Sequence, residues 1–108
     1  MFADGNIAQL YVMKATLSPA EVAAATSAEQ TFTVPGLKLS RDMVMGVSKP
    51  TANAGLGIVG ARVTADNTLG LTFMNATAGA LTPTASQVYM IAIARVDGGT
   101  VEAEKYIV

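Results

Sequence analysis

The fold is decided by the stretch from Gly57 to Arg95, in which three strand-like runs are separated by turn chemistry. It begins with GIVGARV (57–63), passes through TADNT (64–68) into LGLTFMN (69–75), and ends with QVYMIAIAR (87–95). Apolar residues alternate along these runs with the period of a β-strand. Asp and Asn tolerate left-handed backbone, so TADNT is a turn between two strands. This stretch supplies most of the apolar bulk of a small β core.

The last of these runs has a second property. Val88–Ala94 is apolar on both faces, because Val88, Met90, Ala92 and Ala94 alternate with Tyr89, Ile91 and Ile93. A strand of this kind is typical of the centre of a sheet, or of a sheet whose outer face another subunit covers.

More strand-like runs lie outside this stretch and end in turn signals such as Pro35-Gly36. In one of them, alternation puts Met43, Met45 and Val47 on one face. Seven or eight short strands predict one all-β domain over residues 1–108, a small antiparallel β-sandwich of jelly-roll-like or immunoglobulin-like kind with extended terminal segments. The additional runs are Ile7–Lys14, Gln30–Val34, Met43–Val47 and 100–108.

The segment 16–28 fits two structures. Ser18-Pro19-Ala20-Glu21 matches a helix capping box with proline at the first helical position. However, Thr26-Ser27 interrupts the alanine-rich run after about two turns, which is too short for a stable helix without packing. We favour the alternative, a strand over Ala20–Ala25 that turns at 26–28. The longest connection, 75–86, is expected to be functional or pinned by a neighbour.

Composition and charge favour an assembly subunit. Hydrophobic residues make up 51% of the 108-residue chain and charged residues 14%, against about 25% charged in ordinary soluble domains. The net charge is −1, and the absence of a basic stripe argues against nucleic-acid binding. No apolar run approaches the ~20 residues of a membrane span. Asp4 stands where a signal peptide would carry Lys or Arg, which argues against secretion.

No pattern in the chain predicts catalysis, a cofactor or a metal. The chain contains no histidine and no cysteine, so the commonest base and the thiolate ligands are missing. Asp66 and Asp97 stand in turns, where aspartate is favoured for backbone reasons. Asp4-Gly5-Asn6 lacks the spacing of a calcium loop. GLGIVG (55–60) matches a dinucleotide fingerprint only in its letters, because no βαβ pattern surrounds it.

Four segments together resemble a recurrent pattern of tailed-bacteriophage structural proteins. They are TFTVPGL (31–37), KPTANAGLGIVGARVTADNTLGLTFMN (49–75), LTP (81–83) and QVYMIAIAR (87–95). This pattern is similar to that of small phage β-sandwich proteins, including capsid decoration (cement) proteins. The resemblance covers about two thirds of the chain and consists of turn and strand residues.

The resemblance implies a virion structural protein without enzymatic activity. Such a protein decorates and stabilises the outer capsid surface by binding the lattice of the major capsid protein, often as a homotrimer, after synthesis in the bacterial host cytoplasm. The alternative is a phage tail, fibre or head-fibre subunit that binds a host glycan or receptor, since the same kind of sandwich serves both.

Candidate contact residues follow from position and residue type. Arg62 and Arg95 each interrupt or end an apolar strand, so each is either a solvated charge or the partner of a carboxylate at a subunit boundary. The six methionines are interpreted as core filler, with an adaptable contact surface as the alternative. Segments 1–14 and 96–108 are possible intersubunit arms. The candidate contacts with other subunits or with coat protein are Phe2, Ile7, Leu10, Arg62, Arg95, Tyr106, Ile107 and Val108.

Overall fold

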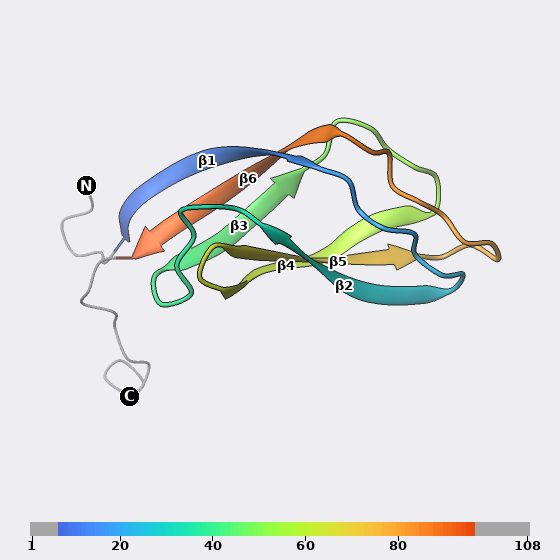
Figure 1. Cartoon of the computed structure of the whole chain (residues 1–108), viewed down its shortest axis with the longest axis horizontal. Helices are drawn as coiled ribbons and strands as arrows, with labels where there is room; N and C mark the ends of the chain where they lie inside the picture. The colour runs from blue at the N-terminus through green and yellow to red at the C-terminus, as the bar shows by residue number, and fades with distance from the viewer. Residues whose placement is uncertain (1–6, 97–108) are drawn as a thin grey trace, which may run out of the picture.

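The computed structural model describes residues 7–96, and within this range the protein is all-β, with no helix (Figure 1). The six strands run antiparallel in two three-stranded sheets. The predicted antiparallel β-sandwich is therefore confirmed at the level of its architecture. The strands are β1 (Ile7–Leu17), β2 (Thr26–Thr33), β3 (Asp42–Ser48), β4 (Leu56–Ala65), β5 (Thr68–Asn75) and β6 (Gln87–Val96).

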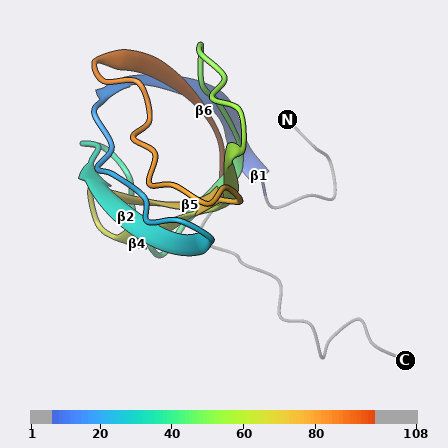
Figure 2. The ribbon, with the colours of Figure 1, turned by 90° about the vertical axis from the view of Figure 1, so that its right-hand side faces the viewer.

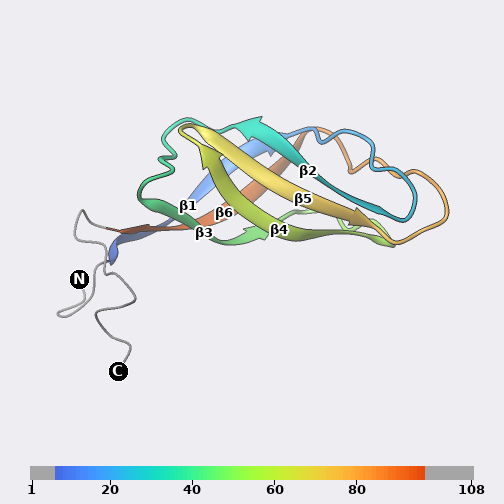
Figure 3. The ribbon, with the colours of Figure 1, turned by 90° about the horizontal axis from the view of Figure 1, so that it is seen from below.

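The two sheets have the orders β1-β6-β3 and β2-β5-β4. Viewed end-on, they lie on opposite sides of the domain (Figure 2), and from below the β2-β5-β4 sheet covers the other (Figure 3). Only the β4–β5 hairpin stays within one sheet, because every other connection crosses to the opposite sheet. The strand with two apolar faces, β6, is the central strand of its sheet, as predicted.

The core lies between the inner faces of the two sheets. Leu71 and Phe73 of β5 and Ile91 of β6 are completely buried there, and the loops add Val22, Val34 and Leu37 to the cluster. The alternation predicted for β5 is confirmed, since its buried apolar side chains stand two residues apart. The complete buried cluster consists of Leu17, Val22, Val34, Leu37, Leu56, Val63, Leu69, Leu71, Phe73, Tyr89, Ile91 and Ile93.

Both structures considered for the segment 16–28 are wrong. The expected turn at 26–28 is the start of β2, and β1 continues to Leu17. Between them, 18–25 is neither a helix nor a strand, and its single ladder contact is a β-bridge between Val22 and Leu81. Its backbone groups bond to other parts of the chain instead: the Gln30 side chain bonds both the amide and the carbonyl of Ala20. The burial of Val22 in the core and the left-handed backbone of Ala25 (φ 50°) complete an irregular path that capping residues alone do not predict.

The long loop after β5 is pinned within this chain. Asn75 is completely buried, and its side-chain amide donates to the carbonyls of Val22 (3.0 Å) and Gly79 (2.8 Å). Its side-chain oxygen accepts from the Thr77 amide (2.9 Å) and hydroxyl (2.7 Å). One buried amide therefore fastens the loop 76–86 to the segment 18–25 and satisfies the buried polar groups of both.

At the opposite end, the turn of the β4–β5 hairpin is tied to the Pro35-Gly36 turn. Asn67, with φ at 61°, accepts through its side chain from the Gly36 amide (2.9 Å), and its own amide donates to the Leu37 carbonyl (2.7 Å). Gly36 itself has φ at 100°, a conformation that side chains disfavour. The two turn signals read from the sequence thus form one hydrogen-bonded unit.

The prediction that Met43, Met45 and Val47 share one face of β3 is wrong. A β-bulge lies between Val44 and Gly46, so Met45 is an extra residue without a partner on β6. Val44 and Val47 pack against the core, whereas Met43 and Met45 are exposed. One extra residue shifts the alternation by one position, which puts side chains on the opposite face.

The final predicted strand, 100–108, lies outside the described residues, as do most of the two proposed arms, so these predictions remain untested.

Candidate interaction surface

The outer face of the β1-β6-β3 sheet is predominantly apolar, with Lys14, Thr16 and Ser48 as its polar residues. Cross-strand register places its side chains in rows of neighbours. One row joins Leu10, Ala94 and Met43, and the next joins Val12, Ala92 and Gly46, beside the bulge residue Met45. We call this surface the apolar face. Its large side chains are Leu10, Val12, Met43, Met45, Val88 and Met90.

These six side chains are exposed to an extent that is unusual for large hydrophobic groups gathered on one sheet. Each residue is between 45% and 60% exposed, and the six exposed fractions add up to the exposure of about three complete side chains. At about 1.5–3 kcal/mol per large apolar side chain, covering them would contribute about 5–9 kcal/mol. Contiguous apolar patches of this kind mark interaction sites on soluble proteins.

The relief of the apolar face is a trough between two ridges. Ala92 and Ala94 of β6 form the floor, while Leu10 and Val12 of β1 rise on one side and the methionines of β3 on the other. Two shallow grooves, each about 340 Å³, run along this trough. They share Val12 and Ala92 as lining residues, so they form one continuous depression along the face.

Charge is scarce on the apolar face. Lys14 is its one charged residue in the described range, and it stands on the edge strand β1 in the same row as Met90 and Ser48. A lysine at an edge can keep its ammonium group in water while its aliphatic stem extends the apolar surface. The face therefore lacks the charged groups that would select a strongly charged partner.

The outer face of the β2-β5-β4 sheet, which we call the polar face, has the opposite character. Threonine, serine and one ion pair occupy most of its outward positions. Two large apolar residues interrupt it: Met74 of β5, which is 43% exposed, and the bulge residue Val59 of β4, which is 62% exposed. The remaining outward residues are Ser27, Glu29, Thr31, Thr33, Gly57, Gly60, Arg62, Thr64, Ala65, Thr68, Gly70 and Thr72.

The ion pair of the polar face bridges the two edge strands of its sheet. Arg62 of β4 donates two hydrogen bonds of 2.8 Å to the carboxylate of Glu29 on β2. Gly70 of the central strand leaves room for this contact, because a Cβ there would lie 2.8 Å from the Glu29 carboxylate and 2.7 Å from the Thr64 methyl group. The hydrogen bonds from Arg62 hold the pKa of Glu29 below its ordinary value, although desolvation opposes the shift.

Arg95 lies at the end of β6, on the inner side. It donates to both carboxylate oxygens of Asp42 (2.7 and 3.1 Å), to the Tyr11 hydroxyl (2.7 Å) and to the Gly36 carbonyl (3.1 Å). Its guanidinium also lies 5.0 Å from the centre of the Tyr11 ring. Burial by itself would raise the pKa of Asp42, but hydrogen bonds from Arg95 and the Lys38 amide keep that pKa below its ordinary value. This arginine therefore has partners within its own chain.

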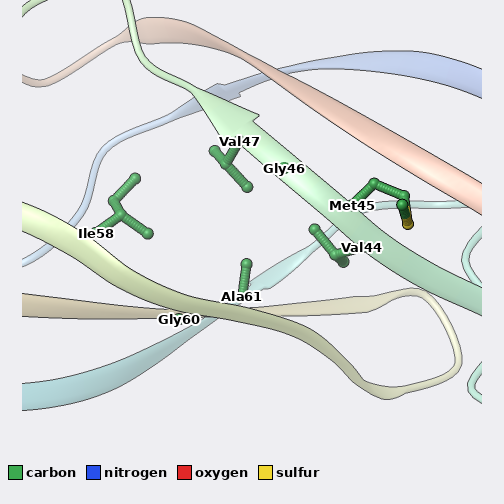
Figure 4. A pocket seen from close by; sticks show the side chains of 7 residues that line it. All are labelled: Val44, Met45, Gly46, Val47, Ile58, Gly60 and Ala61. Atoms are coloured by element: carbon green, nitrogen blue, oxygen red, sulfur yellow. The ribbon is translucent and has the colours of Figure 1, made fainter.

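A separate groove of about 250 Å³ lies where β3 and β4 approach each other between the sheets. In Figure 4, Val44 and Val47 of β3 face Ile58 and Ala61 of β4 across this groove. The bulges of both edge strands, at Met45 and Val59, occur here. Bulges of this kind keep edge strands from pairing further. We therefore interpret the groove as the space that remains between β3 and β4 where the two sheets meet without pairing.

Two other perturbed groups lie away from these surfaces. Burial raises the pKa of Tyr89, whose hydroxyl has no hydrogen-bond partner among the described residues. Burial lowers the pKa of Lys49, whose ammonium donates to the side-chain oxygen of Asn53 (2.7 Å). Neither group is joined to a second titratable residue, so neither forms an acid–base pair within the described range.

The structure separates the predicted contact residues. Leu10 stands on the apolar face, Arg62 on the polar face, and Arg95 at the inner end of the sandwich. Ile7 is half-buried and pairs with Val96 where β1 begins. Phe2, Tyr106, Ile107 and Val108 lie outside the described residues.

Sequence reasoning missed most of the apolar face. Val12 was not singled out, and Val88 was named only as part of the run with two apolar faces. The methionines at 43, 45 and 90 were interpreted chiefly as core filler, which is wrong for these exposed residues and for Met74 on the other sheet. The alternative interpretation, an adaptable contact surface, fits their positions better. The signal that could have found the face was the apolar outer side of β6.

The part of the chain that the structure describes offers little for other kinds of site. Residues 7–96 contain no cluster of three metal-ligating side chains. No helix in that range is long and apolar enough to cross a membrane. The glycines of GLGIVG lie in a turn and in β4, and no helix follows, so the letters do not form a dinucleotide site.

Comparison of the chain with protein-family models, with curated proteins and with solved structures finds no match.

Proposed function

We propose that this protein is a structural subunit of a bacteriophage particle, which decorates and stabilises the capsid by binding the lattice of the major capsid protein. The observation that carries the proposal is the apolar face, because a subunit that functions in an assembly buries such a surface and a free monomer exposes it to water. The resemblance of the sequence to phage structural proteins is the reason to propose a phage particle as that assembly.

Two further features of the described residues support a structural role. The core is continuous, and side-chain hydrogen bonds close each end of the sandwich, through the buried Asn75 at one end and the half-buried Arg95 at the other. A decoration protein needs such rigidity, because its contribution to the particle comes from binding the assembled lattice more tightly than the dissociated coat protein.

The alternative, a tail or fibre subunit that binds a host glycan, has less support. Glycan sites commonly stack sugars on exposed aromatic rings. Within residues 7–96, Tyr11 and Phe32 are half-buried, while Phe73 and Tyr89 are completely buried. The described surface therefore offers no exposed aromatic platform.

The test is the number of copies of this protein in each purified particle, measured by quantitative mass spectrometry against the major capsid protein. The proposal predicts a fixed, near-stoichiometric ratio to the coat protein. A few copies per particle would instead favour the tail or fibre role, and absence from the particle would contradict both.

A second test concerns the chain ends. Deleting residues 1–6 or 103–108 is expected to weaken binding to capsids while leaving the sandwich folded, because the candidate contacts at the chain ends lie in these segments. If both shortened chains bound capsids as well as the full chain, the chain ends would not be part of the proposed contact with coat protein.

A further inference from the structure

We infer that the apolar face is the contact surface between two copies of this chain, which pack sheet against sheet about a two-fold axis parallel to β6. The inference goes beyond the proposed function, because such a pair forms without coat protein, and the coat protein would then contact a surface of the pair other than the apolar face. It also differs from the trimer that the resemblance implies, since a two-fold contact joins copies in pairs.

The charge of the face favours a second copy as the occupant. Lys14 is the single charged residue on the face within the described range, and no carboxylate lies beside it there. A partner with a charged surface would have to bury charges without matching groups. A second copy brings a surface with the same single lysine at its edge and no other charge within the described range.

The register of the strands shows how the face can complement itself. With the two-fold axis along β6, strand β1 of one copy lies over β3 of the other. Leu10 then faces Met43 of the other copy, and Val12 faces Met45. The same operation places Lys14 over Ser48, whose hydroxyl can accept a hydrogen bond from the ammonium group. An axis across the strands would instead press Lys14 onto Leu10.

The size of the face suits a small pair contact. Its strands of 11, 10 and 7 residues form a surface of about 15 by 30 Å. This projected area of about 450 Å² is more than half of the roughly 800 Å² that each partner buries in a specific interface, and the projecting side chains add to the area that is buried. The ridges of β1 and β3 and the alanine trough between them allow two such sheets to interdigitate, as the two sheets of a sandwich do at about 10 Å separation.

The experiment uses full-length chains that each carry one cysteine, because the natural chain has none. Facing sheets are too far apart for a disulfide but close enough for a short bis-maleimide linker. We expect a mixture of Leu10→Cys and Met43→Cys chains to cross-link more than about tenfold faster than Leu10→Cys alone, since matched sites reach a high effective concentration. Val59→Cys mixed with Leu10→Cys is the control, because Val59 lies on the other sheet and is equally exposed.

The mass of the unmodified protein in solution, measured by sedimentation, completes the test. The inference predicts a particle of two 11.1 kDa chains. A single-chain mass at every concentration, or a three-chain mass, would overturn it. A two-chain mass would also overturn it if the Val59 mixture cross-linked as fast as the Leu10–Met43 mixture, because the copies would then meet through another surface. Both measurements use free protein only. A result that contradicts the two-fold pair would therefore not decide the proposed function, which the copy number in the particle tests.

Discussion

The two outer faces of this sandwich differ although the two sheets have the same construction. Each sheet has three antiparallel strands, a central strand with a buried inner face, and a bulge in the edge strand that lies at the β3–β4 boundary. One outer face carries threonines and an ion pair, while the other carries six large exposed apolar side chains. The fold itself tolerates a polar outer face, so packing among residues 7–96 does not explain the apolar one. The contact with a second copy that we infer would explain it.

The largest expected effect is on self-association. Val12→Glu places a carboxylate in the middle of the apolar face, and burying it in the pair would be strongly unfavourable. We expect the association constant to fall by a factor of about 10³ or more. At protein concentrations below association, the melting temperature should equal that of the control. Val59→Glu is the matched control, because the same substitution occurs at equal exposure on the other sheet. If both variants associated equally in sedimentation experiments, the apolar face would not be the contact surface.

The next prediction concerns the inner faces, which should not differ. Ile91 of the apolar sheet and Leu71 of the polar sheet are both completely buried in the same core. Replacing either by alanine is expected to lower the free energy of unfolding by about 2–5 kcal/mol, through lost apolar contact and the cavity that remains. Urea denaturation at a protein concentration below association measures both. A much smaller loss for Ile91→Ala would mean that the apolar sheet is loosely packed on both sides.

A smaller effect should separate the two arginine–carboxylate pairs. The pKa of Asp42 in the folded protein lies below its ordinary value of 3.8, so its ionised form stabilises the fold above that pH and the contribution disappears as the pH falls through the folded pKa. Asp42→Asn should reduce stability at pH 7 by about 1–3 kcal/mol, because it replaces a charged acceptor in a buried hydrogen-bond network.

The pH dependence checks this assignment. The Asp42→Asn protein should lose less stability than the natural protein between pH 5 and pH 2, as measured by urea unfolding at each pH. Glu29→Gln is the control, because the pKa of Glu29 is shifted in the same direction but its pair with Arg62 is exposed, and exposed pairs contribute little. An equal effect of the two substitutions would contradict the difference in burial.

The sequence predicted the strands well and the irregular segments poorly. Alternation identified β5 and the central position of β6, because period-2 patterns report burial directly. The path of residues 18–25 could not be predicted, since it depends on the buried Asn75 amide, whose partners lie 53 residues away for Val22 and 4 for Gly79. Local capping signals carry no information about such long-range bonds.

The apolar face shows a different limit of sequence reasoning. Met43 and Met45 were placed on the wrong side because one bulge residue shifts the alternation of β3. Arg62 and Arg95 were interpreted as solvated charges or as partners of a carboxylate at a subunit boundary. The sequence does not say that carboxylates of the same chain lie in reach, Glu29 across the central strand β5 and Asp42 on the neighbouring strand β3. Apolar residues on the outside of a sheet look the same in sequence as core residues, and only the register assigns them to a face.

The most direct measurement is the rate at which hydrogen peroxide oxidises two methionines of the full-length protein at assembling concentrations. Met90 of the apolar face and Met74 of the polar face have nearly equal exposure in one chain, 45% and 43%, so they report on the two faces within one sample. If a second copy covers the apolar face, Met90 should be oxidised much more slowly than Met74, and dilution should remove the difference. Equal rates at all concentrations would show that the apolar face is open to water and would contradict the account.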